Sequence, residues 1–402
     1  MSAFNRSFVK TELQENRYEQ LSRAADRIAG YAEEADRLSR FSHASIEVLR
    51  EIGYPAFTLP CEYEGKGISL YEFVLYQERL AQGDASIALG MGWHLGILFD
   101  LAHKRPWPET KFAEVCLQSA RNGALLNRAA SESATGSPSR GGMPQTVAVQ
   151  DGGGYRIRGR KTFTTLAPVL DYFIVTAVLE ETGEHAELLV ERETAGVSID
   201  PTWNMAGMRG TASHDLVLDD AWVPADSIVE VHTAEKGRQA SPYLLHIPAC
   251  YLGIGLAARR EALHFAARYQ PSTLDKPILH TEQVKRLLGL IELELCAARH
   301  FMYSVAERWD QGVTRPESLA ADLAAVKYAA VRAAVSAVDQ AMQIVGVHSL
   351  AMSHPLQRMY RDVRFGLHNP PMNDTTLRLL ADRAAAEAEA EGPGEGARLH
   401  LS

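Results

Sequence analysis

The stretch Asp171-Tyr-Phe-Ile-Val-Thr-Ala-Val-Leu179 is an almost continuous apolar run near the middle of a 402-residue chain. Such a run favours a strand that is buried on both faces. Around it, the segments Thr146-Val-Ala-Val-Gln150, Tyr155-Arg-Ile-Arg-Gly159 and Asp215-Leu-Val-Leu-Asp219 alternate between apolar and polar residues, as half-buried strands do. The turn Asp151-Gly-Gly-Gly154 predicts a hairpin between two of them. No helix of about ten residues fits between these runs, so we expect an antiparallel barrel or sandwich.

The residues on both sides of the predicted strands have a helical pattern. Within residues 11–121, apolar residues recur at spacings of three and four, for example at Leu21, Ala25 and Ile28. Within residues 243–388 the pattern is helical again, in longer pieces. The order of helices, strands and helices predicts an α+β chain, mostly α, with a β domain inserted between two helical domains.

The long helix expected over residues 318–345 is apolar around much of its circumference, which predicts burial among other helices. Gly346 is placed to end it. Residues 386–397 are poor in bulky apolar side chains and predict a frayed tail. The predicted limits are 1–123 for an N-terminal helical domain, 124–235 for the central β domain, 236–386 for a C-terminal helical bundle and 387–402 for a flexible tail.

Composition and charge exclude several classes of function. The chain has 41 Lys and Arg against 50 Asp and Glu, so its formal net charge of −9 argues against nucleic acid and anionic membranes as partners. No apolar run reaches the roughly 18–20 residues of a membrane span, and the first residues lack the apolar stretch of a signal peptide. The four cysteines are far apart without a CxxC pair. We therefore expect a cytoplasmic protein with reduced thiols and no bound metal.

Common catalytic motifs are missing or misplaced. Gly253-Ile-Gly-Leu-Ala-Ala258 matches a dinucleotide-binding fingerprint in letters, but it follows a predicted helix rather than a strand. Small residues at a helix–helix contact explain that segment better. The sequence contains no HExxH motif, no Walker loop and no serine in a nucleophile-elbow sequence, so hydrolysis and phosphoryl transfer are not predicted.

Two histidines are candidates for chemistry. His94 lies in the apolar segment 88–96, where a lone histidine is more often a satisfied core residue than a catalyst. His368 lies in Gly366-Leu-His-Asn-Pro-Pro-Met-Asn-Asp374, a polar turn between helices of the kind that often carries functional groups. The same prolines can simply end one helix and begin the next, so residue type alone leaves both interpretations of His368 open.

Over about residues 15–385 the chain resembles the acyl-CoA dehydrogenase superfamily, because five strings similar to that family's motifs occur in the family's order. They are Leu49-Arg-Glu-Ile-Gly53 with Leu59-Pro-Cys-Glu-Tyr-Glu-Gly-Lys-Gly67, Ala130-Ser-Glu-Ser-Ala-Thr-Gly-Ser137, Lys161-Thr-Phe-Thr-Thr165, Met208-Arg-Gly-Thr211 with Val217-Leu-Asp-Asp-Ala-Trp-Val-Pro224, and Gln343-Ile-Val-Gly346 with Arg358-Met-Tyr-Arg-Asp362. The resemblance implies three domains ending in a four-helix bundle, FAD bound between the β domain and the bundle, and a homotetramer or homodimer.

The resemblance also implies roles for individual residues. Ser131 and Ser137 would offer donors to the flavin, Ser137 also facing the substrate, and Phe163 would pack on the isoalloxazine ring. Thr165 would hydrogen-bond near the flavin N5 edge. Across a subunit interface, Gln343 and Gly346 would line the dinucleotide part of FAD. Each residue also has a local explanation, as a turn, core or cap residue.

The family's chemistry requires a base, and here the sequence departs from the family. Oxidation of an acyl thioester removes an α-proton while the β-hydride passes to the flavin, and a glutamate normally takes that proton. The glutamate's place falls near Pro370, and its alternative place falls near Leu245 and His246, none of which is a carboxylate. The arginine string that meets the FAD phosphates is also replaced, with Lys276 as the nearest basic residue, and a second glycine after Gly346 is missing.

These departures keep three functions open. The first is an FAD-dependent oxidoreductase that acts on an acyl-CoA or similar thioester, with His368 handling the proton, Asp374 as a weaker candidate, Arg209 facing an anionic ligand, and an electron-transfer flavoprotein as a possible oxidant. The second is a monooxygenase that uses reduced flavin, FAD or FMN, and O2. Leu367-His-Asn-Pro370 and Trp93-His94 resemble strings of the dibenzothiophene monooxygenase-like branch, which makes His94 a second candidate catalytic residue. The third is a flavin-binding protein without catalysis.

Overall fold

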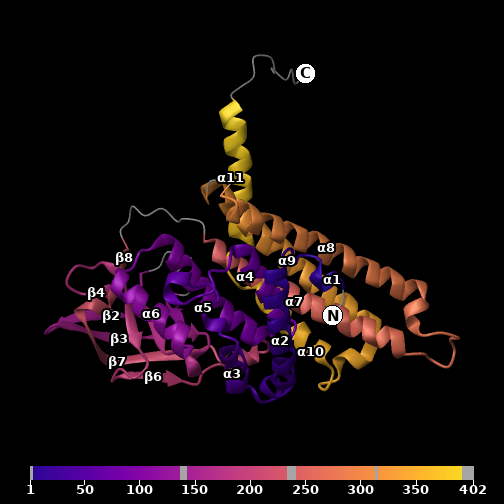
Figure 1. Ribbon diagram of the computed structural model, residues 1–402, viewed down its shortest axis with the longest axis horizontal. Coiled ribbons are helices and arrows are strands. Elements are labelled where there is room, and N and C mark those ends of the chain that lie inside the picture. Colours follow the sequence, from indigo (N-terminus) through magenta and orange to yellow (C-terminus); the bar gives the residue numbers. More distant parts are fainter. Residues whose placement is uncertain (1–2, 136–142, 233–240, 313–315, 392–402) are drawn as a thin grey trace.

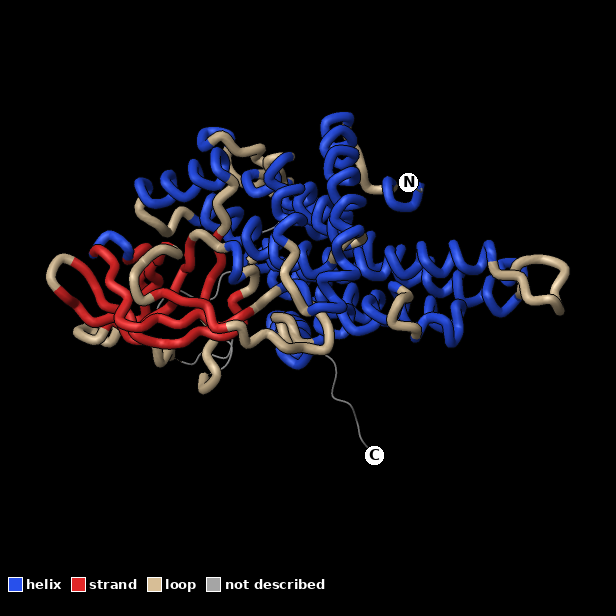
Figure 2. The backbone as a smooth tube through the Cα atoms, turned by 90° about the horizontal axis from the view of Figure 1, so that it is seen from below, coloured by secondary structure: helices blue, strands red, loops and turns tan. Residues whose placement is uncertain are grey.

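A computed structural model describes residues 3–135, 143–232, 241–312 and 316–391 of the chain. Helices fill most of the molecule and the strands gather at one end of it (Figure 1). Turned by 90°, the molecule shows the same division, with the sheet on one side and long helices running away from it (Figure 2). The predicted α+β fold, mostly α, is confirmed.

The N-terminal part is helical. Its helices are α1 (Ala3–Arg6), α2 (Glu12–Leu38), α3 (His43–Glu51), α4 (Leu70–Ala81), α5 (Ala85–Lys104) and α6 (Glu109–Asn122). The helix α4 begins at a capping box, in which Ser69 and Glu72 exchange side-chain and backbone hydrogen bonds. The Asp84 carboxylate caps α5 by accepting from the backbone N–H groups of Ser86 and Ile87.

The helix α5 is the core helix of this part. Its length and apolar composition would suffice to cross a membrane, but 83% of its most apolar window is buried inside the protein. Two of its glycines allow neighbouring elements to approach closely. A Cβ atom at Gly92 would collide with the His246 ring, and one at Gly96 would lie 2.6 Å from Cδ2 of Tyr243. The apolar sequence of α5 is therefore explained by packing.

The central part is one eight-stranded sheet in the order β6-β7-β3-β2-β4-β5-β8, with β1 paired to β4. The strands are β1 (Leu126–Ala129), β2 (Val147–Asp151), β3 (Gly154–Thr164), β4 (Tyr172–Leu179), β5 (His185–Glu191), β6 (Val197–Asp200), β7 (His214–Pro224) and β8 (Ile228–His232). The predicted hairpin joins β2 to β3, with Asp151 opposite Gly154. As the sequence predicts, β4 is almost entirely buried.

The expectation of antiparallel pairing holds for most of the sheet but not at β4. This strand pairs antiparallel with β5 but parallel with both β1 and β2. The parallel pairs form without an α-helical crossover among the described residues, because along the chain the β2–β3 hairpin lies between β1 and β4, and β3 lies between β2 and β4. The buried apolar run at β4 follows from this position inside the sheet.

The C-terminal part contains α7 (His246–Arg268), α8 (Glu282–Asp310), α9 (Pro316–Val345), α10 (Pro355–Val363) and α11 (Asn373–Glu391). Gly346 follows α9 with a φ of +67°, which suits glycine at a helix end. The tail expected from residue 387 begins as helix, because α11 continues to Glu391 and projects from the body of the molecule (Figure 1). Alternating Ala and Glu are strong helix formers, which explains this difference. Residues 392–402 lie outside the described residues.

A buried ion pair joins the N-terminal helices to the bundle. Arg299 of α8 donates from Nε and Nη2 to the two carboxylate oxygens of Glu78 in α4, at 2.9 and 2.8 Å. Both side chains are only 1% exposed. The Tyr303 hydroxyl donates a further hydrogen bond to Glu78 at 3.2 Å. The geometry is bidentate, so the attraction offsets much of the desolvation cost of both charges.

Breaking this pair should be strongly destabilising. Replacement of Glu78 by alanine leaves the Arg299 guanidinium buried without its counter-charge, so Glu78→Ala should lower the free energy of unfolding by about 3–5 kcal/mol. Urea denaturation followed by circular dichroism measures this loss. The control is Glu51→Ala in the exposed Arg27–Glu51 pair, which should lower the stability far less. Equal losses of stability in the two variants would contradict a special contribution of the buried Arg299–Glu78 pair.

Candidate active site

A cavity of about 440 Å³ lies where the three parts of the chain meet. Its lining comes from α5, from β1 and the residues that follow it, and from the end of β3. The segment from Trp203 to Ser213, the turn before α7 and the turn between α10 and α11 complete it. The lining residues are Leu89, Trp93, Ile97, Asn127, Arg128, Ala130, Ser131, Glu132, Thr162, Phe163, Thr165, Trp203, Met208, Thr211, Ser213, Tyr243, Phe365, His368, Asn369 and Pro370. This volume suits a small organic ligand or the ring system of a cofactor.

One wall of the cavity is aromatic. Phe163 stays 56% exposed although it lies beside the core. It adopts a φ of +58°, an uncommon conformation for a bulky residue, of the kind that is found at functional sites. Trp203 packs edge-to-face against Phe163 and Phe365, with centroids 6.0 Å away in both cases. The strained backbone therefore presents an aromatic ring to the cavity, as the family resemblance implies for a residue that packs on a flavin.

Hydroxyl and amide groups line the adjoining wall. Thr165 Oγ1 lies 2.9 Å from Ser213 Oγ, which donates to Thr211 Oγ1 at 2.9 Å. Asn127 donates from Nδ2 to the Thr165 carbonyl at 3.0 Å. Within the described part of the chain, the buried Thr162 Oγ1 has no hydrogen-bond partner. An orphaned hydroxyl in a cavity wall is expected to meet a polar ligand, so this wall fits the polar edge of a planar aromatic cofactor.

Glu132 is the one carboxylate among the described lining residues, and its oxygens are already occupied. Its carboxylate accepts from Lys161 Nζ at 2.5 Å, from the Gln145 and Thr146 backbone N–H groups and from the Thr146 hydroxyl. Both members of the pair are almost fully buried. Burial opposes ionisation of Glu132, but these hydrogen bonds outweigh it and hold its pKa below the usual range. Glu132 is therefore a structural anion and not a base ready to take a proton.

His368 lines the cavity, as expected for a proton-handling residue, and so do its neighbours Asn369 and Pro370. The Tyr251 hydroxyl donates to Asn369 Oδ1 at 2.5 Å, which anchors this segment to α7. The structure thus brings His368 together with Ser131, Phe163 and Thr165, residues from parts of the sequence far from it.

His94 does not line the cavity, contrary to its place as a second catalytic candidate. Its Nδ1 accepts from the Leu126 backbone N–H at 3.1 Å, and its Nε2 lies 3.0 Å from the Pro55 carbonyl. Both ring nitrogens are thus used, and burial lowers its pKa to about 4. His94 is a neutral core residue that ties α5 to β1, which is the alternative that its apolar segment suggested.

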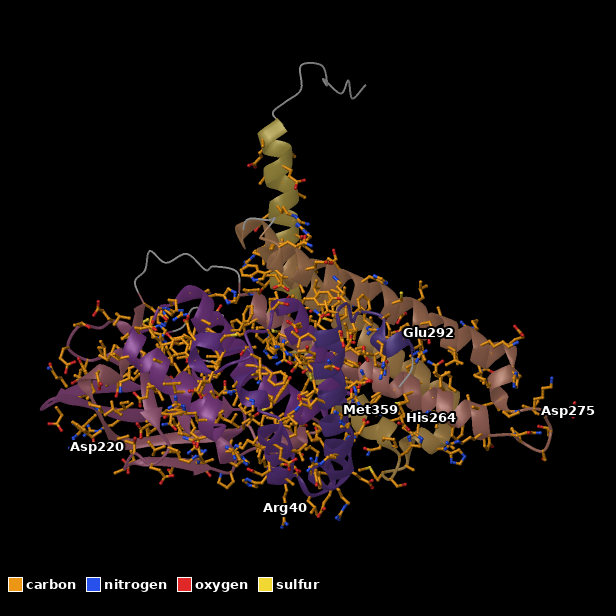
Figure 3. All side chains as sticks on the ribbon, in the orientation of Figure 1. Arg40, Asp220, His264, Asp275, Glu292 and Met359 are labelled. Atoms are coloured by element: carbon orange, nitrogen blue, oxygen red, sulfur yellow. The ribbon has the colours of Figure 1, made fainter. Side chains whose placement is uncertain are left out.

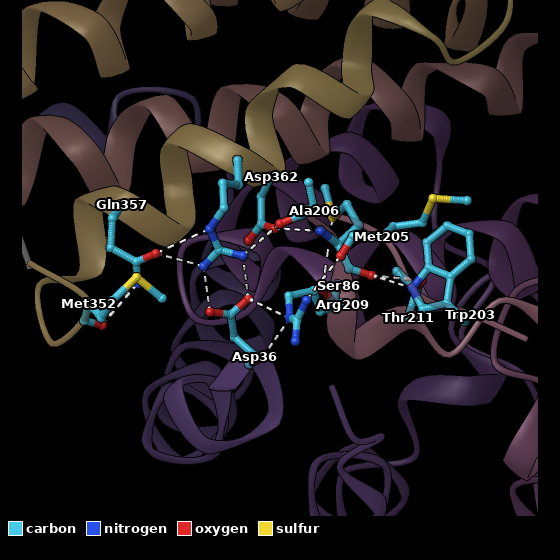
Figure 4. A network of polar contacts seen from close by, with 12 residues as sticks. Asp36, Ser86, Trp203, Met205, Ala206, Arg209, Thr211, Met352, Gln357 and Asp362 are labelled. Atoms are coloured by element: carbon cyan, nitrogen blue, oxygen red, sulfur yellow. Dashed lines mark hydrogen bonds and ion pairs between the residues drawn. The ribbon is translucent and has the colours of Figure 1, made fainter. Parts of the chain in front are cut away.

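Arg209 and Asp374 also lie outside the cavity. Arg209 donates from Nε to the Asp36 carbonyl at 2.7 Å and from Nη1 to the Met205 carbonyl at 3.2 Å. It belongs to a network that also joins Asp36 to Arg361 of α10 (Figure 4). Asp374 is an exposed residue in the first turn of α11. Neither residue faces a ligand in this cavity, because one is used at a domain junction and the other points to solvent.

The other predicted cofactor residues are separate from the cavity. Gln343 lines a groove of about 870 Å³ on α8 and α9, and Gly346 follows on the surface. Lys276 is exposed next to Asp275, at the end of the bundle opposite Asp220 of the sheet (Figure 3). Their expected contacts lie across a subunit interface, so these roles stay predictions. Ser137 lies outside the described residues.

The polar and aromatic cavity residues to which the sequence analysis gave no role include Trp93, Asn127, Arg128 and Tyr243. Asn127 and Arg128 directly precede the Ala130–Ser137 string, so the residues before a recognised motif were the available signal. Tyr243 precedes α7, and Trp93 lies one turn from Leu89 and Ile97 on the same face of α5. The Trp93-His94 string contains Trp93, but the role in that string was given to His94, and no local pattern marked Tyr243.

The fold and cavity together define a class of protein: a helical domain, a β domain and a helical bundle that enclose a small-molecule site at their junction. Three domain families of the acyl-CoA dehydrogenases match the chain in the order of the structure. The N-terminal domain matches residues 11–104, the middle domain residues 127–221 and the C-terminal domain residues 245–367. The chain therefore belongs to the acyl-CoA dehydrogenase family.

Individual relatives carry different activities. The chain is 45% identical to YdbM of Bacillus subtilis, provisionally named an acyl-CoA dehydrogenase, over 94% of this chain and 98% of that protein. It is 30% identical to the amino sugar nitrososynthase DnmZ of Streptomyces peucetius, over 81% and 82% of the two chains. TdsC of Paenibacillus sp. A11-2, solved with FMN and indole, has the same fold, with a TM-score of 0.80 at 22% identity over 90% and 94% of the chains.

A buried acid beside the cavity should make stability depend on pH. The Met208 backbone N–H donates to Asp362 at 2.5 Å, and burial raises the pKa of Asp362 to about 7 from an ordinary 3.8. The folded state therefore holds this proton where the unfolded state has lost it, so the protein loses stability as the pH rises from about 4 to about 7.

The variant Asp362→Asn should remove this part of the pH dependence, because an amide can still accept from Met208 but does not ionise. The thermal midpoint of the variant, relative to the wild type, should rise between pH 5 and pH 8. Differential scanning calorimetry at several pH values measures the difference. The exposed Asp382→Asn is the control, and a constant offset between Asp362→Asn and the wild type would contradict the prediction.

Proposed function

We propose that this protein is a monooxygenase that uses reduced flavin and O2 to oxidise a small organic substrate in the cavity. The observation that carries the proposal is the absence, among the described lining residues, of a carboxylate able to take a proton. Glu132 is held by Lys161, and Pro370 stands where the family places its glutamate. This reverses the order in which the sequence suggested the two reactions.

The cavity wall offers groups that would hold the flavin ring. Phe163 would pack on it, and Thr162, Thr165 and Ser131 would donate hydrogen bonds to its polar edge. When bound, reduced flavin supplies the electrons that activate O2. We propose FMN rather than FAD, because the arginine string that meets the FAD phosphates and the second glycine after Gly346 are both replaced in this sequence. The FMN bound to TdsC supports this choice.

His368 would handle a proton at the cavity, since an imidazole nitrogen can accept or donate one. The Tyr251–Asn369 hydrogen bond would hold its segment in place, and the aromatic wall would exclude water. The name of DnmZ supports an oxygenation, because a nitroso group contains a new nitrogen–oxygen bond. The second candidate is oxidation of an acyl thioester, with His368 as the base, and the name of YdbM favours it.

Two measurements on the flavin-loaded protein separate the reactions. In the first, oxidised protein meets a panel of acyl-CoAs without oxygen, and we expect no bleaching of the flavin absorbance. In the second, chemically reduced protein meets ¹⁸O2 with indole or 3-phenylpropanoate as a probe, and we expect mass spectrometry to find ¹⁸O in a product of at least one of them. Bleaching by any acyl-CoA would overturn the proposal in favour of the second candidate.

The variant His368→Ala should reduce turnover by about 10²–10⁴-fold, because it removes the proton-handling group. Flavin binding should be unchanged, since the proposed ring contacts come from other elements. Steady-state oxygen incorporation and flavin titration measure the two effects separately. The matched control is His348→Ala, an exposed histidine outside the cavity lining. Full turnover in His368→Ala would remove this residue from the mechanism.

A further inference from the structure

Arg128 places a positive charge in the wall of the cavity. It extends from β1 and is 29% exposed at its side chain, although the strand around it is buried. Among the described lining residues the charged side chains are Arg128 and Glu132, and Lys161 already balances Glu132. Glu132 is almost fully buried whereas Arg128 is partly exposed, so Arg128 is the charged side chain that a ligand in the cavity would meet.

The partner of Arg128 lies behind it. Glu187 of β5 accepts from Nη2 at 3.2 Å, and its other oxygen lies 2.9 Å from Nε. This carboxylate is only 4% exposed and does not line the cavity. Burial opposes its ionisation, but Arg128 holds the pKa of Glu187 below its usual range. Nη2 donates to Glu187 and Nε lies beside it, so Nη1 is not used by Glu187. The Tyr243 hydroxyl of the cavity wall is a second hydrogen-bonding neighbour of this guanidinium.

The surroundings of Arg128 define the rest of the ligand. Leu89, Trp93 and Ile97 project from one face of α5 and give the cavity an apolar wall. Asp100, one turn further along α5, is paired with Lys104 at 2.9 Å and does not line the cavity. A ligand that satisfies both features has an apolar body and an anionic oxygen group, because an arginine fork pairs well with such oxygens.

We propose that Arg128 is a specificity-determining residue and that the substrate is a small organic acid, with a carboxylate or similar oxyanion directed at Arg128. This inference rests on the proposed function, since it names the substrate class of the same site. In this arrangement Glu187 orients the guanidinium, and the apolar wall of α5 contacts the body of the substrate.

Two probes of nearly equal shape test the proposal. They are 3-phenylpropanoate and 3-phenylpropanamide, which differ in charge at one end. Calorimetric titration of the oxidised protein, purified with its flavin, measures both dissociation constants. We expect the carboxylate to bind at least about tenfold more tightly than the amide. Equal affinities, or no binding of the carboxylate, would overturn the proposal.

Variants of the Arg128–Glu187 pair test whether Arg128 causes the preference for the carboxylate over the amide. In Arg128→Gln/Glu187→Gln the pair becomes neutral without leaving a lone buried charge, and the preference should fall to within about twofold. In Arg128→Lys the charge remains without the fork, so part of the preference should persist. The control is the same double change at the exposed Arg27 and Glu51, which should leave the preference for the carboxylate unchanged. A preference that survives the Arg128→Gln/Glu187→Gln change would overturn the proposal.

The binding test needs neither O2 nor turnover. If the protein fails to incorporate oxygen but prefers the carboxylate, the proposed reaction fails and the specificity stands. If oxygen is incorporated without any preference for the carboxylate, the specificity fails and the proposed reaction stands.

Discussion

The buried ion pair between Lys161 and Glu132 holds the cavity in shape. Glu132 follows Ser131 and Lys161 precedes Thr162, so the ion pair lies beside the Ser131–Thr162 bridge and joins the residues after β1 to β3 in one wall of the cavity. Removing two charged groups from water costs free energy. Here the cost is offset because backbone and hydroxyl donors also hydrogen-bond to the Glu132 carboxylate. The hydrogen bonds that stabilise this wall also occupy the oxygens of Glu132, the one carboxylate among the described lining residues, so Glu132 is not available as a base. Structure and reactivity are thus set by one interaction.

Much of the fold could be predicted because it follows from local periodicity. The apolar run at β4, the hairpin between β2 and β3 and the long helix α9 all correspond to patterns that a single segment displays. The parallel neighbours of β4 could not be predicted in this way, because pairing depends on how distant loops return to the sheet. The extension of α11 to Glu391 depends on helix propensity, which outweighed the low apolar content of that segment.

The site was predicted unevenly, and for a physical reason. Phe163, Thr165, Ser131 and His368 lie in strings that resemble the family, and all four line the cavity. His94 and Arg209 have equally suitable side chains, but their polar atoms are used by the Pro55 and Asp36 carbonyls. Residue type states what a side chain can do, whereas its partners decide whether it is free to do it. Those partners come from distant segments, so the sequence does not display them.

Helix α5 has two kinds of positions. Some contact α7 and the turn before it, and others line the cavity. At Gly92 and Gly96 the backbone of α5 lies directly against His246 and Tyr243, so a side chain at either position would push this region of the C-terminal part away from α5. Leu89, Trp93 and Ile97 repeat every fourth residue on the face that lines the cavity. Substitutions at Leu89 and Ile97 would reshape the pocket, whereas Trp93 also packs edge-to-face on His246 of α7, with ring centroids 4.7 Å apart. One helix thereby keeps the architecture constant and leaves the choice of substrate open to evolution.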